Sequence, residues 1–179
     1  MSNPLLSLLC CCGLALGVSL AHASDANRQL STEIKADALR YDDQQKLSIF
    51  TGHVVLTRGS LKITGSRLEL KEDDQGRQTG QAMGSPATFE RVREQAPNEL
   101  ITGEAKHITY DTRTNVMQLR GDGQLRRLRD GKLSDEVRGQ AIDYFDDTGT
   151  FSAQGQANKG DKAGRVHVII GPKPSPAGQ

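Results

Sequence analysis

One spacing recurs three times along this chain of 179 residues and constrains its fold more than any other feature. An apolar residue is followed two positions later by a tyrosine, and the tyrosine is followed eleven positions later by a glycine. The three copies, which use every tyrosine of the protein, are Leu39/Tyr41…Gly52, Ile108/Tyr110…Gly121 and Ile142/Tyr144…Gly155. A looser copy, Leu68/Leu70 with Gly80, fits if one residue slips. Repeated strand–turn–strand units predict one long β-structure of stacked hairpins, with a continuous inner surface and two open ends.

The first residues have the composition of an export signal. Residues 5–20 are mostly apolar or small, and Ala21-His22-Ala23 matches the small-x-small pattern of a signal-peptidase site. We predict a cleaved signal peptide over residues 1–23. A retained membrane anchor is the alternative, although the apolar run is slightly short for a bilayer span. All three cysteines, Cys10 to Cys12, fall inside this segment, so we expect a mature chain without disulfides or a cysteine-ligated metal.

The remaining chain has the composition of a single β-domain, which we place at residues 24–170. Basic and acidic residues nearly cancel, at 23 against 22, which argues against a dedicated nucleic-acid binder. There is no tryptophan, and the 19 glycines suit tight turns between regular strands. Residues 171–179 contain three prolines, which cannot continue a ladder, and we expect this tail to be disordered.

Apolar and polar residues alternate along the whole domain, while helical spacing is absent. The alternation predicts about a dozen or more short antiparallel strands, with a hairpin at Asp130-Gly131 and a long loop over Arg91–Glu99. Strands with one apolar face bury it most simply as two facing sheets. The predicted inward positions are Leu39, Tyr41, Phe50, Val54, Leu56, Leu68, Leu70, Phe89, Ile108, Tyr110, Met117, Leu119, Ile142, Tyr144 and Phe151.

Nothing in the sequence forms a recognisable catalytic or metal constellation. His53, His107 and His167 lie in separate expected strands without metal-ligand spacing, and the carboxylates cluster in expected turns. No nucleophile elbow or phosphate loop is present. We therefore expect no enzyme activity, no metal and no cofactor.

Three segments carry a resemblance to a known family. They are Gly-Ser-Arg-Leu-Glu-Leu at 65–70, Gly-Ser-Pro-Ala-Thr-Phe at 84–89, and Phe-Thr-Gly-His-Val-Val-Leu-Thr-Arg-Gly at 50–59. In their order and spacing along the chain, these segments resemble the LptA/OstA family, the periplasmic bridge proteins of lipopolysaccharide transport. The similarity spans roughly residues 34–170.

The resemblance implies a twisted antiparallel β-jellyroll of two facing sheets, open at both ends. It implies that lipopolysaccharide acyl chains lie between the sheets and that copies stack head to tail. The bridge would connect an inner-membrane anchored component of the transport system to its outer-membrane translocon. The rival interpretations are a structural scaffold of the envelope and a periplasmic carbohydrate-active enzyme.

Candidate site residues follow from the resemblance and from the alternation. Positions of the family that face the lipid match Thr32, Phe89 and Tyr110, and at Thr32 the family has a larger apolar residue. Ile34 is added because it lies one pleat repeat beyond Thr32. The other candidate lipid contacts, chosen from the inward positions, are Phe50, Leu70, Leu119 and Tyr144.

Two strands are candidates for end-to-end pairing. The segment around Thr32–Ala36 of one copy would pair with Arg165–Ile170 of the next, since exposed sheet edges accept an added strand. The predicted edge residues are Ile34, Ala36, Val166, Val168 and Ile170. Separately, the basic run Arg126–Lys132 would either contact lipid phosphates or sugar acids, or form a solvated hairpin.

The expected task explains why an apolar trough is needed. An acyl chain of about a dozen methylenes costs roughly 10 kcal/mol to expose to water. Such a lipid crosses an aqueous compartment only along a continuous apolar path that also releases it.

Overall fold

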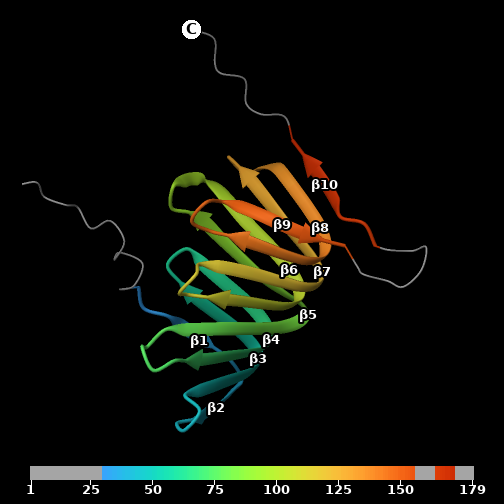
Figure 1. Cartoon of the computed structure of the whole chain (residues 1–179). Coiled ribbons are helices and arrows are strands. Elements are labelled where there is room, and N and C mark those ends of the chain that lie inside the picture. Colours follow the sequence, from blue (N-terminus) through green and yellow to red (C-terminus); the bar gives the residue numbers. More distant parts are fainter. Residues whose placement is uncertain (1–29, 156–163, 172–179) are drawn as a thin grey trace, which may run out of the picture.

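The computed structural model describes residues 30–155 and 164–171, and in these ranges the chain is entirely β-structure (Figure 1). The predicted signal peptide (1–23) and residues 172–179 of the predicted tail lie outside the described residues. The strands are all antiparallel to their neighbours. They are β1 (Glu33–Lys35), β2 (Ala38–Asp42), β3 (Leu47–Arg58), β4 (Leu61–Glu72), β5 (Gln78–Arg93), β6 (Ala96–Asp111), β7 (Val116–Arg129), β8 (Lys132–Phe145), β9 (Thr150–Gln154) and β10 (His167–Ile170).

The strands are fewer and longer than the alternation predicted. The described part of the chain has ten, and β3 to β8 run for 12 to 16 residues each. The expected loop over Arg91–Glu99 was also wrong, because β5 continues to Arg93 and β6 begins at Ala96. Its charged residues indicated a loop, but Arg91 and Glu99 are buried in ion pairs and continue the ladder.

Each long strand contributes to two layers. The pairing register breaks at the same level across the sheet, in β3 between Thr51 and Val54 and in β7 between Arg120 and Gly123. On one side of these bulges lie the segments that pair with β2 and β9, which we call layer A. On the other side lie the segments that pair with β1 and β10, which we call layer B. The two predicted facing sheets are thus two halves of one set of bent strands, and the all-β jellyroll is confirmed.

The sequence repeat corresponds to the hairpins of layer A. Each tyrosine lies near the end of a strand, and the residue five positions later occupies the left-handed region at the end of the turn: Lys46 at φ 48°, Asn115 at 52° and Gly149 at 65°. The returning strands reach Gly52 and Gly121, whose φ values of 99° and 81° place them at the crossing into layer B. Glycine is required there because side chains disfavour this backbone conformation. The predicted Asp130-Gly131 turn is confirmed, with positive φ at both residues.

The core lies between the layers and contains almost all of the predicted inward positions. Leu39 and Tyr41 are the exceptions, since they are 60% and 59% exposed. Leu39 pairs with Phe50, and Tyr41 with Ser48, so both stand on the inner face. The alternation therefore predicted their face correctly and their burial wrongly. They lie on the edge strand β2, where no further strand covers the inner face.

Candidate functional site

A hollow with a volume of about 850 Å³ lies between the layers at the β1 end of the molecule. Three of the predicted lipid contacts, Thr32, Ile34 and Leu70, line it together. Thr32 and Ile34 come from the β1 segment of layer B, whereas Leu70 comes from the layer A half of β4. The remaining lining residues are Leu30, Arg58, Gln75, Gly76, Arg77, Gln78, Thr112 and Arg113.

The hollow combines an apolar wall with a cationic rim. Leu30, Ile34 and Leu70 supply the apolar part, and Arg58, Arg77 and Arg113 lie at turn ends of three hairpins. Arg77 binds Asp73 at 2.7 Å, and hydrogen bonds from the Arg77 backbone and side chain lower the pKa of that carboxyl. Arg113 is 3.6 Å from Asp111 in a longer, more exposed ion pair. An apolar wall beneath a ring of arginines fits an amphipathic anion.

No local sequence pattern predicts this cationic rim. The three arginines are separated by 19 and 36 positions, so they form no local charge excess. Only the stacking of hairpins brings their turns to one opening. Leu30 was not predicted either, because it precedes the first alternating segment.

The other predicted lipid contacts do not line this hollow. Phe89, Tyr110, Leu119 and Tyr144 are buried in the core, and Phe50 is half-buried against it. A cavity of about 10 Å³ lies along this part of the interior, lined by Ile101, Leu125, Arg127, Asp135, Val137, Tyr144 and Phe151. That space is about one water-sized probe and too small for a hydrocarbon chain. In this conformation the interior is therefore open at the β1 end and filled by side chains along β5 to β8.

The basic run Arg126–Lys132 is paired with acids rather than freely solvated. Arg126 and Arg138 bind Glu136 at 2.8 and 2.7 Å, and Arg129 binds Glu99 at 2.6 Å. The hydrogen bond from Arg126 is the main cause that lowers the pKa of Glu136. Burial alone would raise the pKa of Glu99, but hydrogen bonds from Arg129 and Arg93 outweigh it and lower that pKa. Arg129 thus combines a partly exposed side chain with an ion pair to a buried carboxylate.

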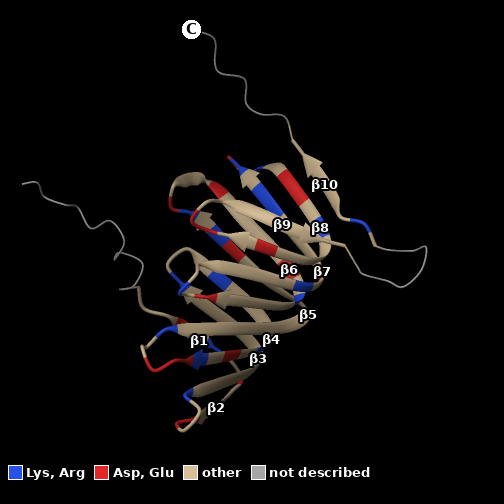
Figure 2. Ribbon diagram, viewed as in Figure 1, with Lys and Arg blue, Asp and Glu red and all other residues tan. Residues whose placement is uncertain are grey.

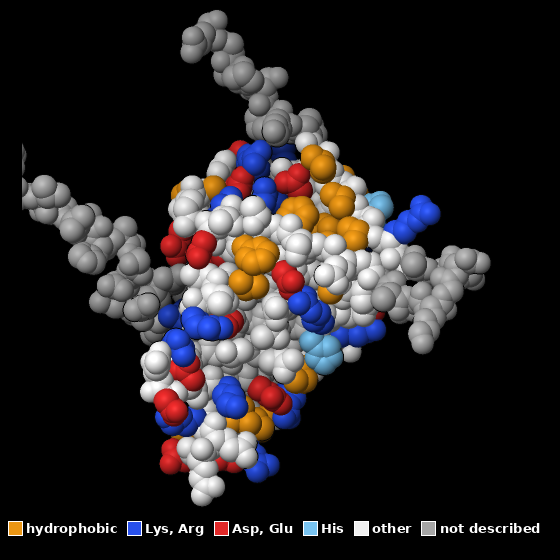
Figure 3. Space-filling model, viewed as in Figure 1, with side chains coloured by type: hydrophobic (Ala, Val, Ile, Leu, Met, Phe, Trp, Pro, Cys, Tyr) orange, Lys and Arg blue, Asp and Glu red, His pale blue; other side chains and the backbone are white. Residues whose placement is uncertain are grey.

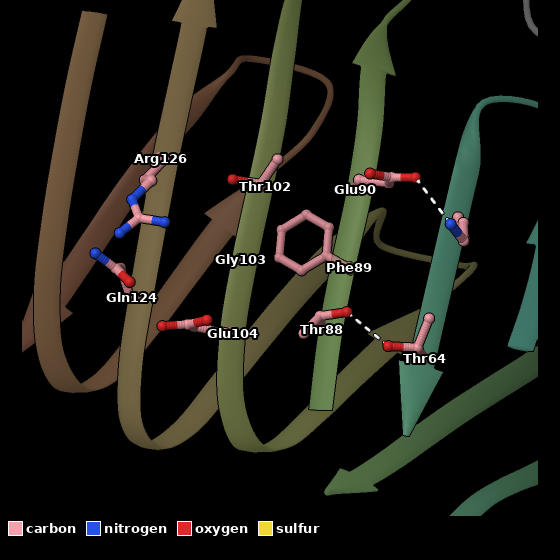
Figure 4. Close-up of a pocket in the computed structure, with 10 residues that line it drawn as sticks. Thr64, Thr88, Phe89, Glu90, Thr102, Gly103, Glu104, Gln124 and Arg126 are labelled. Carbon is pink, nitrogen blue, oxygen red and sulfur yellow. Dashed lines mark hydrogen bonds and ion pairs between the residues drawn. The ribbon is translucent and has the colours of Figure 1, made fainter. Parts of the chain in front are cut away.

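A second hollow, of about 210 Å³, lies on the outer face of layer B (Figure 4). Its lining is mostly polar: the hydroxyls of Thr64 and Thr88 are 2.6 Å apart, and Lys62 binds Glu90 at 3.4 Å. Phe89 and Gly103 also line it. This depression has no aliphatic side chain in its lining and lies outside the space between the layers, so we do not assign it to an acyl chain.

The two ends of the molecule leave the inner face uncovered. β1 and β2 form the edges of layers B and A at one end, and β10 and β9 form the corresponding edges at the other. Val168 pairs with the buried Val137 and so stands on the inner face, yet it is 43% exposed. Figure 3 shows hydrophobic side chains gathered where β10 lies.

The predicted edge residues occupy these two strands or their immediate neighbours. Ile34 lies in β1, and Val168 and Ile170 lie in β10. Ala36 and Val166 are exposed one residue beyond these strands. The final strand is shorter than the predicted Arg165–Ile170, because it begins at His167.

Within residues 30–155 and 164–171, no three His, Cys, Asp or Glu side chains converge as metal ligands would. His53 instead lies 2.9 Å from Asp37, whose pKa is lowered mainly by the side-chain hydrogen bond with His53. No helix long and apolar enough to cross a bilayer occurs in the same ranges.

Comparison with known proteins places this architecture in a family. The family described as "LptA/(LptD N-terminal domain) LPS transport protein" matches residues 33–150. The lipopolysaccharide export system protein LptH of Pseudomonas aeruginosa is 36% identical over 89 residues, which are 49% of this chain and 50% of that protein. The export system protein LptA of Escherichia coli K12 is 25% identical over 122 residues, 65% of each. The chain thus spans about half of one of these curated relatives and just under two thirds of the other.

A solved structure gives the same result. The crystal structure of P. aeruginosa LptH, described as the LptA homologous periplasmic component of the conserved lipopolysaccharide transport device, superposes with a TM-score of 0.68 at 25% identity. The match covers 82% of this chain and 99% of that one. With the family match over most of the strands, the chain belongs to the LptA/(LptD N-terminal domain) family of LPS transport proteins.

Proposed function

We propose that this protein is a periplasmic carrier that binds lipopolysaccharide by its acyl chains between the two layers. The observation that carries the proposal is the hollow at the β1 end, where an apolar inner wall meets three arginines. The acyl chains of lipopolysaccharide need an apolar surface, and its phosphates match guanidinium groups. The relatives named above are themselves lipopolysaccharide export proteins.

The carrier bridges the inner-membrane export complex and the outer-membrane translocon by stacking head to tail. β10 of one copy pairs with β1 of the next and extends layer B, while β9 meets β2 and extends layer A. Such a contact is heterologous and makes an open filament. It also covers the apolar inner-face residues that each end exposes in the single chain, Leu39 and Tyr41 at one end and Val168 at the other.

Lipid binding is tested with a matched pair in layer A. Leu70 and Ile49 are both half-buried, but Leu70 lines the hollow, whereas Ile49 pairs with Glu69 and stands on the outer face. Leu70→Asp removes about 2 kcal/mol of apolar contact, so affinity for fluorescently labelled lipopolysaccharide should fall roughly thirtyfold. Ile49→Asp should leave the affinity of the folded protein within a few fold. Equal affinity for both variants would overturn the assignment of the hollow, and no binding by the wild type would favour the scaffold interpretation.

Stacking is tested with a second pair, on β10. Val168 and Ile169 are 43% and 44% exposed, but Ile169 pairs with Glu136 and stands on the opposite, outer face. Val168→Lys puts a charge on the inner face that the next copy would cover, so sedimentation should show loss of oligomers. Ile169→Lys should retain them. Oligomers that survive Val168→Lys and also removal of residues 165–179 would refute end-to-end pairing through this strand.

A further inference from the structure

Along β5 to β8 the layers are joined at their turn ends by a seam of one ion pair and two hydrogen bonds, made by Arg91 and Arg127. Arg91, on the layer B half of β5, places Nη2 2.8 Å from Oδ2 of Asp146 in the β8–β9 turn of layer A. Its Nη1 donates to the hydroxyl of Tyr110 at 3.3 Å. Arg127 donates from Nη2 to the carbonyl of Gly149 at 2.6 Å. Red and blue segments lie next to one another at these strand ends in Figure 2.

The two sides of this seam belong to separately braced units. In layer B, Glu99 binds Arg93 at 2.7 Å and Arg129 at 2.6 Å, which ties β5, β6 and β7 together. In layer A, the amide of Asp146 donates to the carbonyl of Asn115 at 3.1 Å, which ties the β8–β9 turn to the β6–β7 turn. Parting Arg91 from Asp146 and Tyr110, and Arg127 from Gly149, therefore breaks contacts between the layers and keeps the ties within each layer.

The seam divides the interior into an open and a closed part. At the β1 end the turns of the two layers border a hollow of about 850 Å³. Beneath the seam the cavity has a volume of about 10 Å³, and its walls are more apolar than those of the hollow and include Leu125, Val137 and Phe151. The narrow part of the interior therefore coincides with the contact between Arg91 and Asp146 and has the more apolar walls.

The seam is polar, buried and incompletely satisfied. At the seam, four buried donor atoms of the described residues lack an acceptor: Nε of Arg91, Arg93 and Arg127, and the hydroxyl of Tyr144. Burial raises the pKa of Asp146, and Arg91 only partly opposes this. Opening the seam would hydrate these groups, which offsets the contacts that are lost. A contact of this kind can hold a groove shut and still release it.

We propose that the Arg91–Asp146 seam is a latch over the closed half of the lipid groove. Acyl chains that enter at the β1 end reach the core under β5 to β8 only when the turn carrying Asp146 moves away from Arg91. This inference rests on the proposed lipid binding and adds a contact that controls how far the acyl chains enter the groove.

The test places a photoreactive phenylalanine analogue at Phe151, beneath the seam, or at Leu70, in the open hollow, and measures crosslinking to purified lipopolysaccharide over time. Asp146→Asn weakens the latch and should speed crosslinking at Phe151 at least about tenfold, with the rate at Leu70 unchanged. The matched control is Asp147→Asn: Asp147 is the exposed neighbour, accepts from Asn115 at 3.0 Å and should change neither rate.

The outcomes separate the latch from the function. Crosslinking at Leu70 with an unchanged rate at Phe151 in Asp146→Asn overturns the latch and keeps the lipid-binding proposal. Absence of crosslinking at both positions in every variant overturns the function itself. If Asp146→Asn does not fold, hydrogen exchange measured on the wild type tests the latch instead. Lipopolysaccharide should speed exchange of the Asp146 and Gly149 amides, and unchanged or slower exchange there would refute the latch.

Discussion

Two glycines offer a direct measure of where this β-jellyroll is closed and where it is open. Gly103 and Gly80 both lie in strands, and neither has a positive φ, so alanine suits the backbone at both positions. Both face the interior, Gly103 opposite Phe89 in layer B and Gly80 opposite Leu70 in layer A. The same substitution therefore adds one methyl group to the closed and to the open part of the core.

At Gly103 the methyl group has no room. It would collide with Cε1 of Phe89 and lie 2.9 Å from Cδ1 of the same ring and 3.0 Å from Cδ2 of Leu119. Both neighbours are almost fully buried, at 3% and 0% exposure, so neither can move aside. Overpacking of this kind costs about 1–3 kcal/mol.

At Gly80 the neighbour can yield. The methyl group would lie 3.1 Å from Cδ2 of Leu70 and 4.0 Å from Cδ1 of Leu68. Leu70 borders the hollow and has space to rotate into. The small clash is offset by about 0.4–1 kcal/mol from the reduced entropy of the unfolded chain. Gly80→Ala should therefore remain within about 0.5 kcal/mol of the wild type.

The free energies of unfolding are compared by urea titration followed by circular dichroism, because the chain has no tryptophan. Gly103→Ala should lower the unfolding free energy by at least about 1 kcal/mol more than Gly80→Ala does. Equal losses, or a larger loss at Gly80, would show that the interior is not packed more tightly under β5 to β8 than at the β1 end.

Two further predictions concern buried polar groups. The Tyr144 hydroxyl is buried without a partner in the described structure, and burial raises its pKa to about 12, so Tyr144→Phe should raise the unfolding free energy by about 1 kcal/mol. Tyr110→Phe should lower it by a similar amount, because its hydroxyl accepts from Arg91 and donates to Asn115; the opposite order in urea titrations would contradict both. The folded-state pKa of Glu136 lies below its ordinary value of 4.5, so the unfolded chain binds more protons at this carboxylate as the pH falls. The stabilisation that Glu136 contributes is therefore complete above its ordinary pKa and is lost as the pH falls through the lowered pKa. Urea midpoints at about pH 7 and about pH 3 should therefore differ less in Glu136→Gln than in the wild type, and an equal difference would contradict the ion-pair assignment.

The hairpins were predictable from the sequence because a tight turn requires particular residues at fixed positions near it. Tyr110 and Gly121 mark the two ends of one layer A hairpin, and the left-handed residue Asn115 lies between them in the turn. The point at which a strand crosses between the layers has a weaker sequence pattern. Alternation resumes after the bulge, so one bent strand of 16 residues, such as β5, is hard to distinguish from two short ones. This is why the strand count was too high while the two-layer architecture was correct.

Alternation also fixes the face of a side chain without fixing what lies opposite it. Leu70 and Leu119 both point inward, yet Leu70 borders a hollow and Leu119 is fully buried. In the proposed latch the closed part of the interior is held by Arg91 and Asp146, which are 55 positions apart and lie in different layers. A charged residue in a strand usually indicates a solvent-facing position, so the sequence predicts that Arg91 is exposed, whereas in the structure it is buried between the layers. Under these two proposals, inward-pointing hydrophobic residues define where a lipid lies, and the buried charges determine how far along the groove it travels.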